Sequence, residues 1–238
     1  MKIHENFNSL HKEEEKIRQE HIAIIEQSEE LSKHFSAIHD SMDIISHIIN
    51  NHRNEASDEL VIMRLGIRIF NSISSSIKLH LSGYHQTAFT HIRDIIETGF
   101  LLDYLITNPD KINIWESLDE KGRKTTFSPV KIRIALDERD GYSEKKRGKL
   151  YGLLCNYSTH PTPEGFKLFS PNGLSNIGPF LSKQINEAWM QELIKHTNYA
   201  CIVFVKFFNK SNLLQAKESY LERIQLWANE FLIENQNN

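Results

Sequence analysis

The chain has 238 residues, of which 39% are hydrophobic and 25% charged, and its formal net charge is −3 at pH 7. This composition is ordinary for a globular protein, and so small a net charge excludes a global field that would recruit nucleic acid or an anionic membrane. The N-terminus lacks an apolar stretch of the signal-peptide type, and the longest strongly apolar run, residues 199–208, is too short to span a bilayer. We therefore expect no membrane partner. The two cysteines, Cys155 and Cys201, have no metal-ligand spacing, which favours a reduced, cytoplasmic setting.

Residues 8–53 contain neither proline nor glycine, and an apolar residue recurs in them at every seventh position. The row consists of Leu10, Ile17, Ile24, Leu31, Ile38 and Ile45. A sustained seven-residue repeat predicts a long helix that packs along another helix at a shallow angle. That second helix belongs either to another subunit, which would make the protein a homo-oligomer, or to the same chain. We divide the sequence into a long N-terminal helix or helical arm at 1–55 and a helical bundle domain at 56–238.

Histidine is frequent in the chain, with twelve residues, but its spacing does not indicate a metal site. His34, His39, His47 and His52 share no single helical face, so we expect them at the surface. Glu192 and His196 are four residues apart, whereas a di-iron bundle requires Glu-x-x-His pairs. The sequence therefore predicts no metal and no cofactor.

A second helix is expected from Ser57 to a turn at Gly83, and a third at 84–106. The third helix is apolar over most of its circumference, which predicts a central, buried helix antiparallel to the second. It carries Arg93 and Glu97 at i,i+4 spacing, so their side chains can meet. Because buried charge is costly unless it is paired, we expect the two residues to be buried and bonded to each other, either as a structural ion pair or as part of a site.

The rest of the chain is also expected to be helical, apart from two loops. A polar loop at 119–130 separates short helices, and a helix at 143–160 leads into a proline- and glycine-rich loop whose apolar side chains need burial. Two further helices are expected at about 180–210 and 213–231. Since no glycine-rich phosphate loop or alternation of strands and helices is found, the predicted fold class is all-α: a helical bundle with a long N-terminal helical arm and an irregular Pro/Gly-rich loop.

The end of the 143–160 helix carries a short motif. His160 directly precedes a proline, and Asn156 lies one turn earlier on the same face. The spacing Asn156-x-x-x-His160, late in a helical bundle, resembles the motif of HEPN proteins, a family of nucleotide-binding proteins that often cleave RNA. That motif reads Arg-Asn-x-x-x-His and is completed by an acidic residue from an earlier helix, which Glu97 would supply here. Without such a partner, His160 would only cap its own helix.

The match departs from the HEPN motif at one position. Cys155 stands where the family has arginine, and a thiol cannot make the charged, bidentate phosphate contact of a guanidinium. The charge would then have to come from Arg93 or Arg147.

Two functional hypotheses follow. The first is a helical interaction module, self-associating through the arm; a bacterial stress or defence setting is implied only by a resemblance of the helical pattern to uncharacterised bacterial proteins. The second is a divergent HEPN-like protein that cleaves RNA or binds a nucleotide through Arg93, Glu97, Asn156 and His160. The second requires the 143–160 helix to bring His160 within a water molecule's reach of Glu97 or Arg93.

Overall fold

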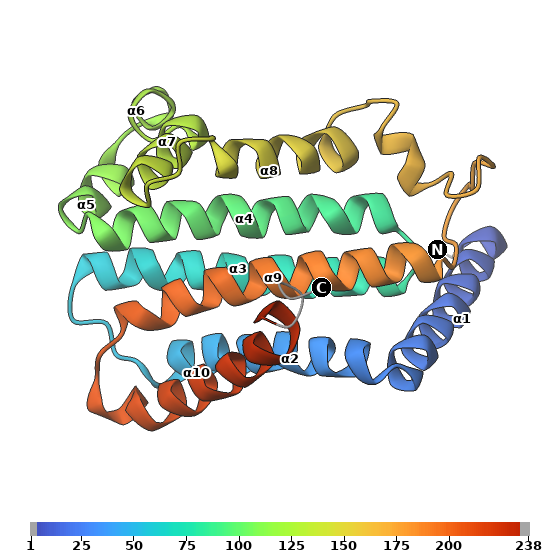
Figure 1. Cartoon of the computed structure of the whole chain (residues 1–238), viewed down its shortest axis with the longest axis horizontal. Helices are drawn as coiled ribbons and strands as arrows, with labels where there is room; N and C mark the ends of the chain where they lie inside the picture. The colour runs from blue at the N-terminus through green and yellow to red at the C-terminus, as the bar shows by residue number, and fades with distance from the viewer. Residues whose placement is uncertain (1–3, 234–238) are drawn as a thin grey trace.

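A computed structural model describes residues 4–233, and every regular element in this range is a helix (Figure 1). The all-α prediction is confirmed. The α-helices are α1 (Glu5–Gln27), α2 (Glu29–Asn51), α3 (Ser57–Leu81), α4 (His85–Thr107), α5 (Asp110–Ser117), α6 (Glu120–Thr126), α7 (Pro129–Arg139), α8 (Lys146–Leu154), α9 (Lys183–Phe207) and α10 (Leu214–Ala228). Two π-helices, η1 (Cys155–Thr159) and η4 (Asn229–Ile233), and two 3-10 helices, η2 (Gly165–Leu168) and η3 (Ser211–Leu213), complete the chain.

The centre of the bundle is α4, as its apolar circumference predicts. It packs along α3 and α9, and α7, α8 and η1 also contact it (Figure 1). Ile92, Ile95 and Leu102 are completely buried. At Gly99 the absence of a side chain allows a close approach, because an added Cβ would lie 3.1 Å from the Cβ of Ala200 in α9. The turn from α3 into α4 needs glycine as well, since Gly83 has φ +87°.

The single N-terminal helix expected over 8–53 is divided into α1 and α2. Ser28 takes an extended conformation, and its hydroxyl accepts a hydrogen bond from the backbone N–H of Leu31. Glu29 and Glu30 follow in the first turn of α2, where acidic residues favour a helix start. As a result α1 turns away from α2 and crosses the end of the bundle where α3 passes into α4 (Figure 1).

The seven-residue apolar row is buried within the chain itself except at Leu10 and Ile24, which are only partly buried. Ile38 and Ile45 have no exposed surface, and α2 packs on α9, α10 and α3. Residues of α2 therefore belong to the same hydrophobic core as those of the helices after residue 56. Of the two partners that the repeat allowed, a helix of the same chain is the one that covers the α2 part of the row. Self-association stays a prediction.

Two of the four histidines expected at the surface are buried. His34 is 3% exposed, and its Nδ1 accepts a hydrogen bond from the indole N–H of Trp227. His52 is 8% exposed and lies 3.1 Å from Glu59. The surface prediction is wrong for both because it considered only the helix that carries them. The ring of His34 is covered by Trp227 of α10 and that of His52 by Phe208 at the end of α9, and both of these residues are distant in the sequence.

The segments expected to be loops differ from expectation in two places. Part of the polar stretch 119–130 forms α6, because the Asp119 carboxylate caps it by accepting a hydrogen bond from the N–H of Gly122. The Pro/Gly-rich loop is irregular as predicted, but Leu174 and Ile177 in it are almost fully exposed rather than buried.

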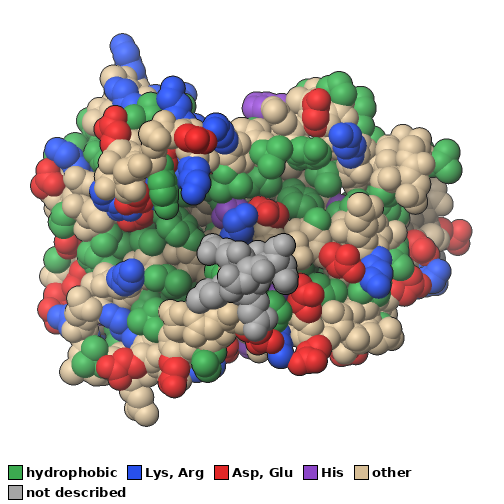
Figure 2. Space-filling model, in the orientation of Figure 1, with side chains coloured by type: hydrophobic (Ala, Val, Ile, Leu, Met, Phe, Trp, Pro, Cys, Tyr) green, Lys and Arg blue, Asp and Glu red, His purple; other side chains and the backbone are tan. Residues whose placement is uncertain are grey.

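The helix α3 is the one described helix that is long and apolar enough to cross a membrane, with a mean hydropathy of 1.3 over an 18-residue window. Half of that window is buried inside the bundle. Core helices of soluble proteins share this composition with membrane spans. On the face viewed in Figure 2, acidic and basic side chains are interspersed, which fits the small net charge of the chain.

The intrachain burial of the apolar row predicts a difference between two isoleucine truncations. Ile45→Ala should lower the free energy of unfolding by roughly 2–5 kcal/mol, because it leaves a cavity in a closed core. The same change at Ile67, which is 40% exposed on α3, should cost less than about 1 kcal/mol. Chemical denaturation of both variants tests this, and equal losses would mean that α2 does not pack as described.

Candidate functional site

Arg93 and Glu97 meet on α4, and a third residue joins them. The Arg93 guanidinium donates to Glu97 over 3.0 Å, and the hydroxyl of Tyr151 from α8 donates to the same carboxylate oxygen over 2.9 Å. The Tyr151 hydroxyl also accepts a hydrogen bond from Arg93. The expected bond is therefore present, but the expected burial is incomplete, since the Arg93 and Glu97 side chains are 26% and 34% exposed.

Tyr151 is a site residue that the sequence analysis missed. Burial raises its pKa to about 12, so the phenol keeps its proton at neutral pH and remains a hydrogen-bond donor to Glu97. Its position in the sequence could have indicated this role. Tyr151 lies three residues before Leu154 and four before Cys155, and these two residues form the buried face of the segment. A tyrosine on that face must point toward α4.

A pocket of about 190 Å³ opens beside this network, between α4 and the α5–α7 segment. Its apolar lining includes the aromatic rings of Phe100, Trp115 and Phe127. Its polar lining includes Glu97 and Arg133. Apolar walls with a few convergent polar groups are typical of small-molecule sites.

Arg133, on α7, is the polar group of this pocket that lacks a counter-ion. It is 9% exposed, and its guanidinium lies 4.0 Å from the centroid of the Tyr151 ring. Within residues 4–233, the Tyr151 ring is its partner in this cation–π contact, and no carboxylate pairs with it. The neighbouring arginines differ, because Arg68 is paired with Asp94 and Arg93 with Glu97. Burial of an unpaired charge is costly, so Arg133 is poised to receive an anion.

Asn156 and His160 lie apart from the pocket. Both are exposed, and among the described residues no hydrogen bond or ion pair joins either side chain to Arg93 or Glu97. The segment does pack on α4 as expected, but η1 lies at the level of Thr90, whose hydroxyl donates to the Ser158 carbonyl over 3.1 Å.

The rise of a helix shows why His160 does not reach the pair. Thr90 precedes Glu97 by seven residues, which corresponds to about 10 Å along α4. The segment runs antiparallel to α4, since Tyr151 faces Glu97 and Ser158 faces Thr90. His160 therefore lies still farther along, away from Glu97. In addition, His160 follows the last residue of η1 and has an extended backbone, so it does not continue the helical face that carries Asn156.

Arg147, the other arginine considered for the missing motif charge, is committed elsewhere. It donates to Asp137 over 2.9 Å and also to Asp140, so it links α8 to α7. Its side chain is 11% exposed. The sequence-predicted set of Arg93, Glu97, Asn156 and His160 thus divides into one bonded pair and two separate surface residues.

The raised pKa of Tyr151 predicts a pH dependence of stability. The pKa of Tyr151 in the folded state, about 12, lies above its value of about 10 in the unfolded state. The contribution of this residue to the free energy of unfolding is therefore fully present below pH 10 and is lost as the pH rises through 12. Tyr151→Phe should remove this contribution. Denaturation at a series of pH values between 9 and 12 should then show a steeper loss of stability for the parent chain than for Tyr151→Phe. Parallel curves would contradict the assigned environment of this phenol.

Comparison with known proteins adds no relative to this geometry. No protein-family model, no curated protein and no solved structure matches the chain. The resemblance to HEPN proteins therefore stays a prediction from six residues and Glu97, and function has to be argued from the site itself.

Proposed function

We propose that the chain binds a small nucleotide in the pocket beside α4. The observation that carries this proposal is Arg133, a cation that is buried in the pocket lining and has no carboxylate partner in the described part of the chain. A phosphate group is a suitable counter-ion, because the planar guanidinium presents paired N–H donors to its oxygens.

The apolar part of the pocket suits a flat ring system. Trp115 and Phe127 line it together with Phe100, and aromatic rings stack favourably on nucleobases. A volume of about 190 Å³ is smaller than the roughly 300–1,000 Å³ of pockets that enclose a drug-sized ligand. It accommodates a base, whereas the remainder of a nucleotide has to extend beyond it.

An open groove of about 560 Å³ adjoins the pocket and provides that space. Arg68 and Asp94 line both cavities, and the groove also includes Arg64 and Arg93. Arg64 and Arg68 are more than half exposed in their pairs with acidic residues. Exposed ion pairs contribute little stability, so these arginines are able to turn toward a phosphate at small cost.

Of the two functional hypotheses from the sequence, this proposal keeps only the nucleotide binding of the HEPN-like one. Nucleotide binding is supported by the pocket, whereas RNA cleavage relied on His160 acting together with Glu97, and the two residues are not joined. The interaction-module hypothesis relied on the apolar row from Leu10 to Ile45, whose α2 part is buried inside the chain.

Titration of the full chain with AMP, adenosine and inorganic phosphate tests the proposal by calorimetry and by tryptophan fluorescence. AMP should bind roughly 10–150-fold more tightly than adenosine, because a hydrogen bond to a charged group contributes about 1.5–3 kcal/mol. Arg133→Met keeps an apolar side chain similar to the aliphatic stem of arginine but removes the charge, so it should abolish this difference.

The matched control is Arg223→Met on α10, an arginine 46% exposed in a pair with Asp40 and far in sequence from the pocket. It should leave AMP affinity unchanged. Equal affinities for AMP and adenosine in the parent chain, or an Arg133→Met variant that still prefers AMP, would contradict the proposal.

A further inference from the structure

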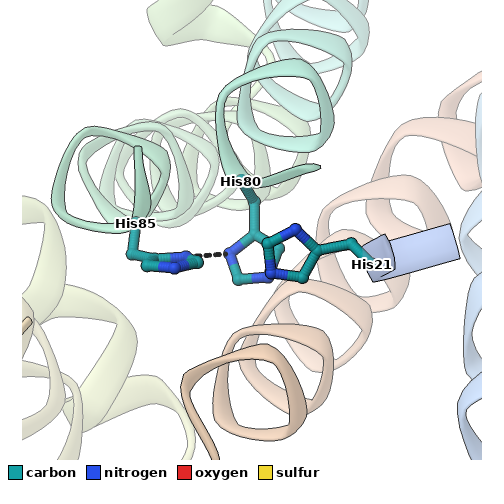
Figure 3. Close-up of side chains that lie close together, drawn as sticks. All are labelled: His21, His80 and His85. Carbon is teal, nitrogen blue, oxygen red and sulfur yellow. Dashed lines mark hydrogen bonds between the residues drawn. The ribbon is translucent and has the colours of Figure 1, made fainter. Parts of the chain in front are cut away.

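Three histidines from separate helices converge at the opposite end of α4 (Figure 3). His21 comes from α1, His80 from the last turn of α3, and His85 is the first residue of α4. One ring nitrogen of each lies within 4.8 Å of the other two. All three residues are at most 1% exposed.

The hydrogen bonds of two rings determine which nitrogen carries a lone pair. His21 Nδ1 lies 3.1 Å from the Leu81 carbonyl, and His85 Nε2 lies 3.0 Å from the Phe180 carbonyl. A carbonyl oxygen only accepts, so in the neutral rings these two nitrogens carry the protons. His21 Nε2 and His85 Nδ1 are then lone-pair atoms. His21 Nε2 is buried and has no hydrogen-bond partner.

The third ring brings another lone pair to the same place. His80 Nε2 lies 2.9 Å from the side-chain oxygen of Asn186, so as an N–H donor it leaves Nδ1 unprotonated. His80 Nδ1 faces His85 Nδ1 at 3.1 Å, which places two lone pairs in contact (Figure 3). Reversal of the Asn186 amide would allow a proton between these two nitrogens, but His21 Nε2 would still lack a partner.

We propose that His21, His80 and His85 bind a divalent transition-metal ion, with Zn²⁺ as the reference case. For Zn–N bonds of about 2.0–2.1 Å, two ligands of a tetrahedral ion are about 3.3 Å apart, close to the 3.1 Å between His80 and His85. His21 has to approach by about 1–1.5 Å to complete the set, since its nitrogen is still within 4.8 Å.

The surroundings of the rings match those of metal ligands. Ligating histidines characteristically donate their second N–H to a carbonyl or carboxylate, and here Leu81, Phe180 and Asn186 provide the acceptors. The His80 ring is also held by Trp189, which stacks on it at 3.9 Å between centroids.

The donor set indicates the class of ion. Three imidazoles without a carboxylate or thiolate suit Zn²⁺, Cu²⁺, Ni²⁺ or Co²⁺ rather than the oxygen-preferring Mg²⁺ and Ca²⁺. Three protein ligands leave a fourth position for water.

The ion would connect α1 to the turn between α3 and α4. A hydrogen bond of 2.7 Å from the Tyr84 hydroxyl to the Glu14 carboxylate makes a second connection there. The sequence-based prediction of no metal considered spacing along the chain, which does not reveal this cluster.

The test is calorimetric titration of the full chain, freed of metal with a chelator, with Zn²⁺ and with Co²⁺. We expect one ion per chain at submicromolar Kd and a rise in Tm on loading. His21→Gln should weaken binding at least 100-fold. His34→Gln, which changes an equally buried histidine outside the cluster, should leave the Kd unchanged.

X-ray absorption of the zinc-loaded parent chain provides a readout that does not depend on the folding of a variant. Three imidazole nitrogens at about 2.0 Å are expected. The proposal is overturned if the parent chain binds no ion at micromolar concentration, if fewer than three imidazoles coordinate it, or if His34→Gln weakens binding as much as His21→Gln does.

Discussion

The burial of α4 on most of its sides is the constraint from which the polar features of this fold follow. A helix with so little solvent-facing surface cannot leave charged side chains unpaired. Each charged residue of α4 accordingly has a partner on a neighbouring helix. Asp94 is bonded to Arg68 and Ser72 of α3, and Arg93 and Glu97 share Tyr151 of α8. Asp103 accepts two hydrogen bonds from Arg139 of α7 and one from Tyr199 of α9. The electrostatics of α4 thereby help to position the surrounding helices.

The two proposed sites lie on α4 but at different levels. His85 begins the helix and Glu97 follows twelve residues later, about 18 Å along the axis. The histidine cluster joins the turn into α4 to α1, whereas the pocket is lined by α3, α4 and the segment from α5 to α7. A metal ion at one end would act on the docking of α1, and a nucleotide at the other end would act on α7 and its neighbours. The central helix contributes residues to both sites.

The sequence predicted those structural features that depend on residues close to one another in the chain. The apolar circumference of 84–106 indicated a central helix, and Gly83 indicated the turn before it, which needs a positive φ. The seven-residue row correctly predicted helical packing, but it did not reveal the break at Ser28, where one capping side chain outweighs a continuous apolar pattern. Tyr151 and the histidine cluster could not be found in this way, because His21 precedes His80 by 59 residues and only the crossing of α1 over the bundle end unites them.

The central claim is that the charged residues of α4 are paired, whereas Arg133 of α7 has no carboxylate partner within residues 4–233 and is available to an anion. A crystal structure of the full chain grown with AMP tests this most directly. We predict electron density for the base between Trp115 and Phe127 and a phosphate oxygen at about 2.7–2.9 Å from the Arg133 guanidinium. An Arg133 that is instead paired with Glu97 or Asp94, with no nucleotide density in the pocket, would contradict the account.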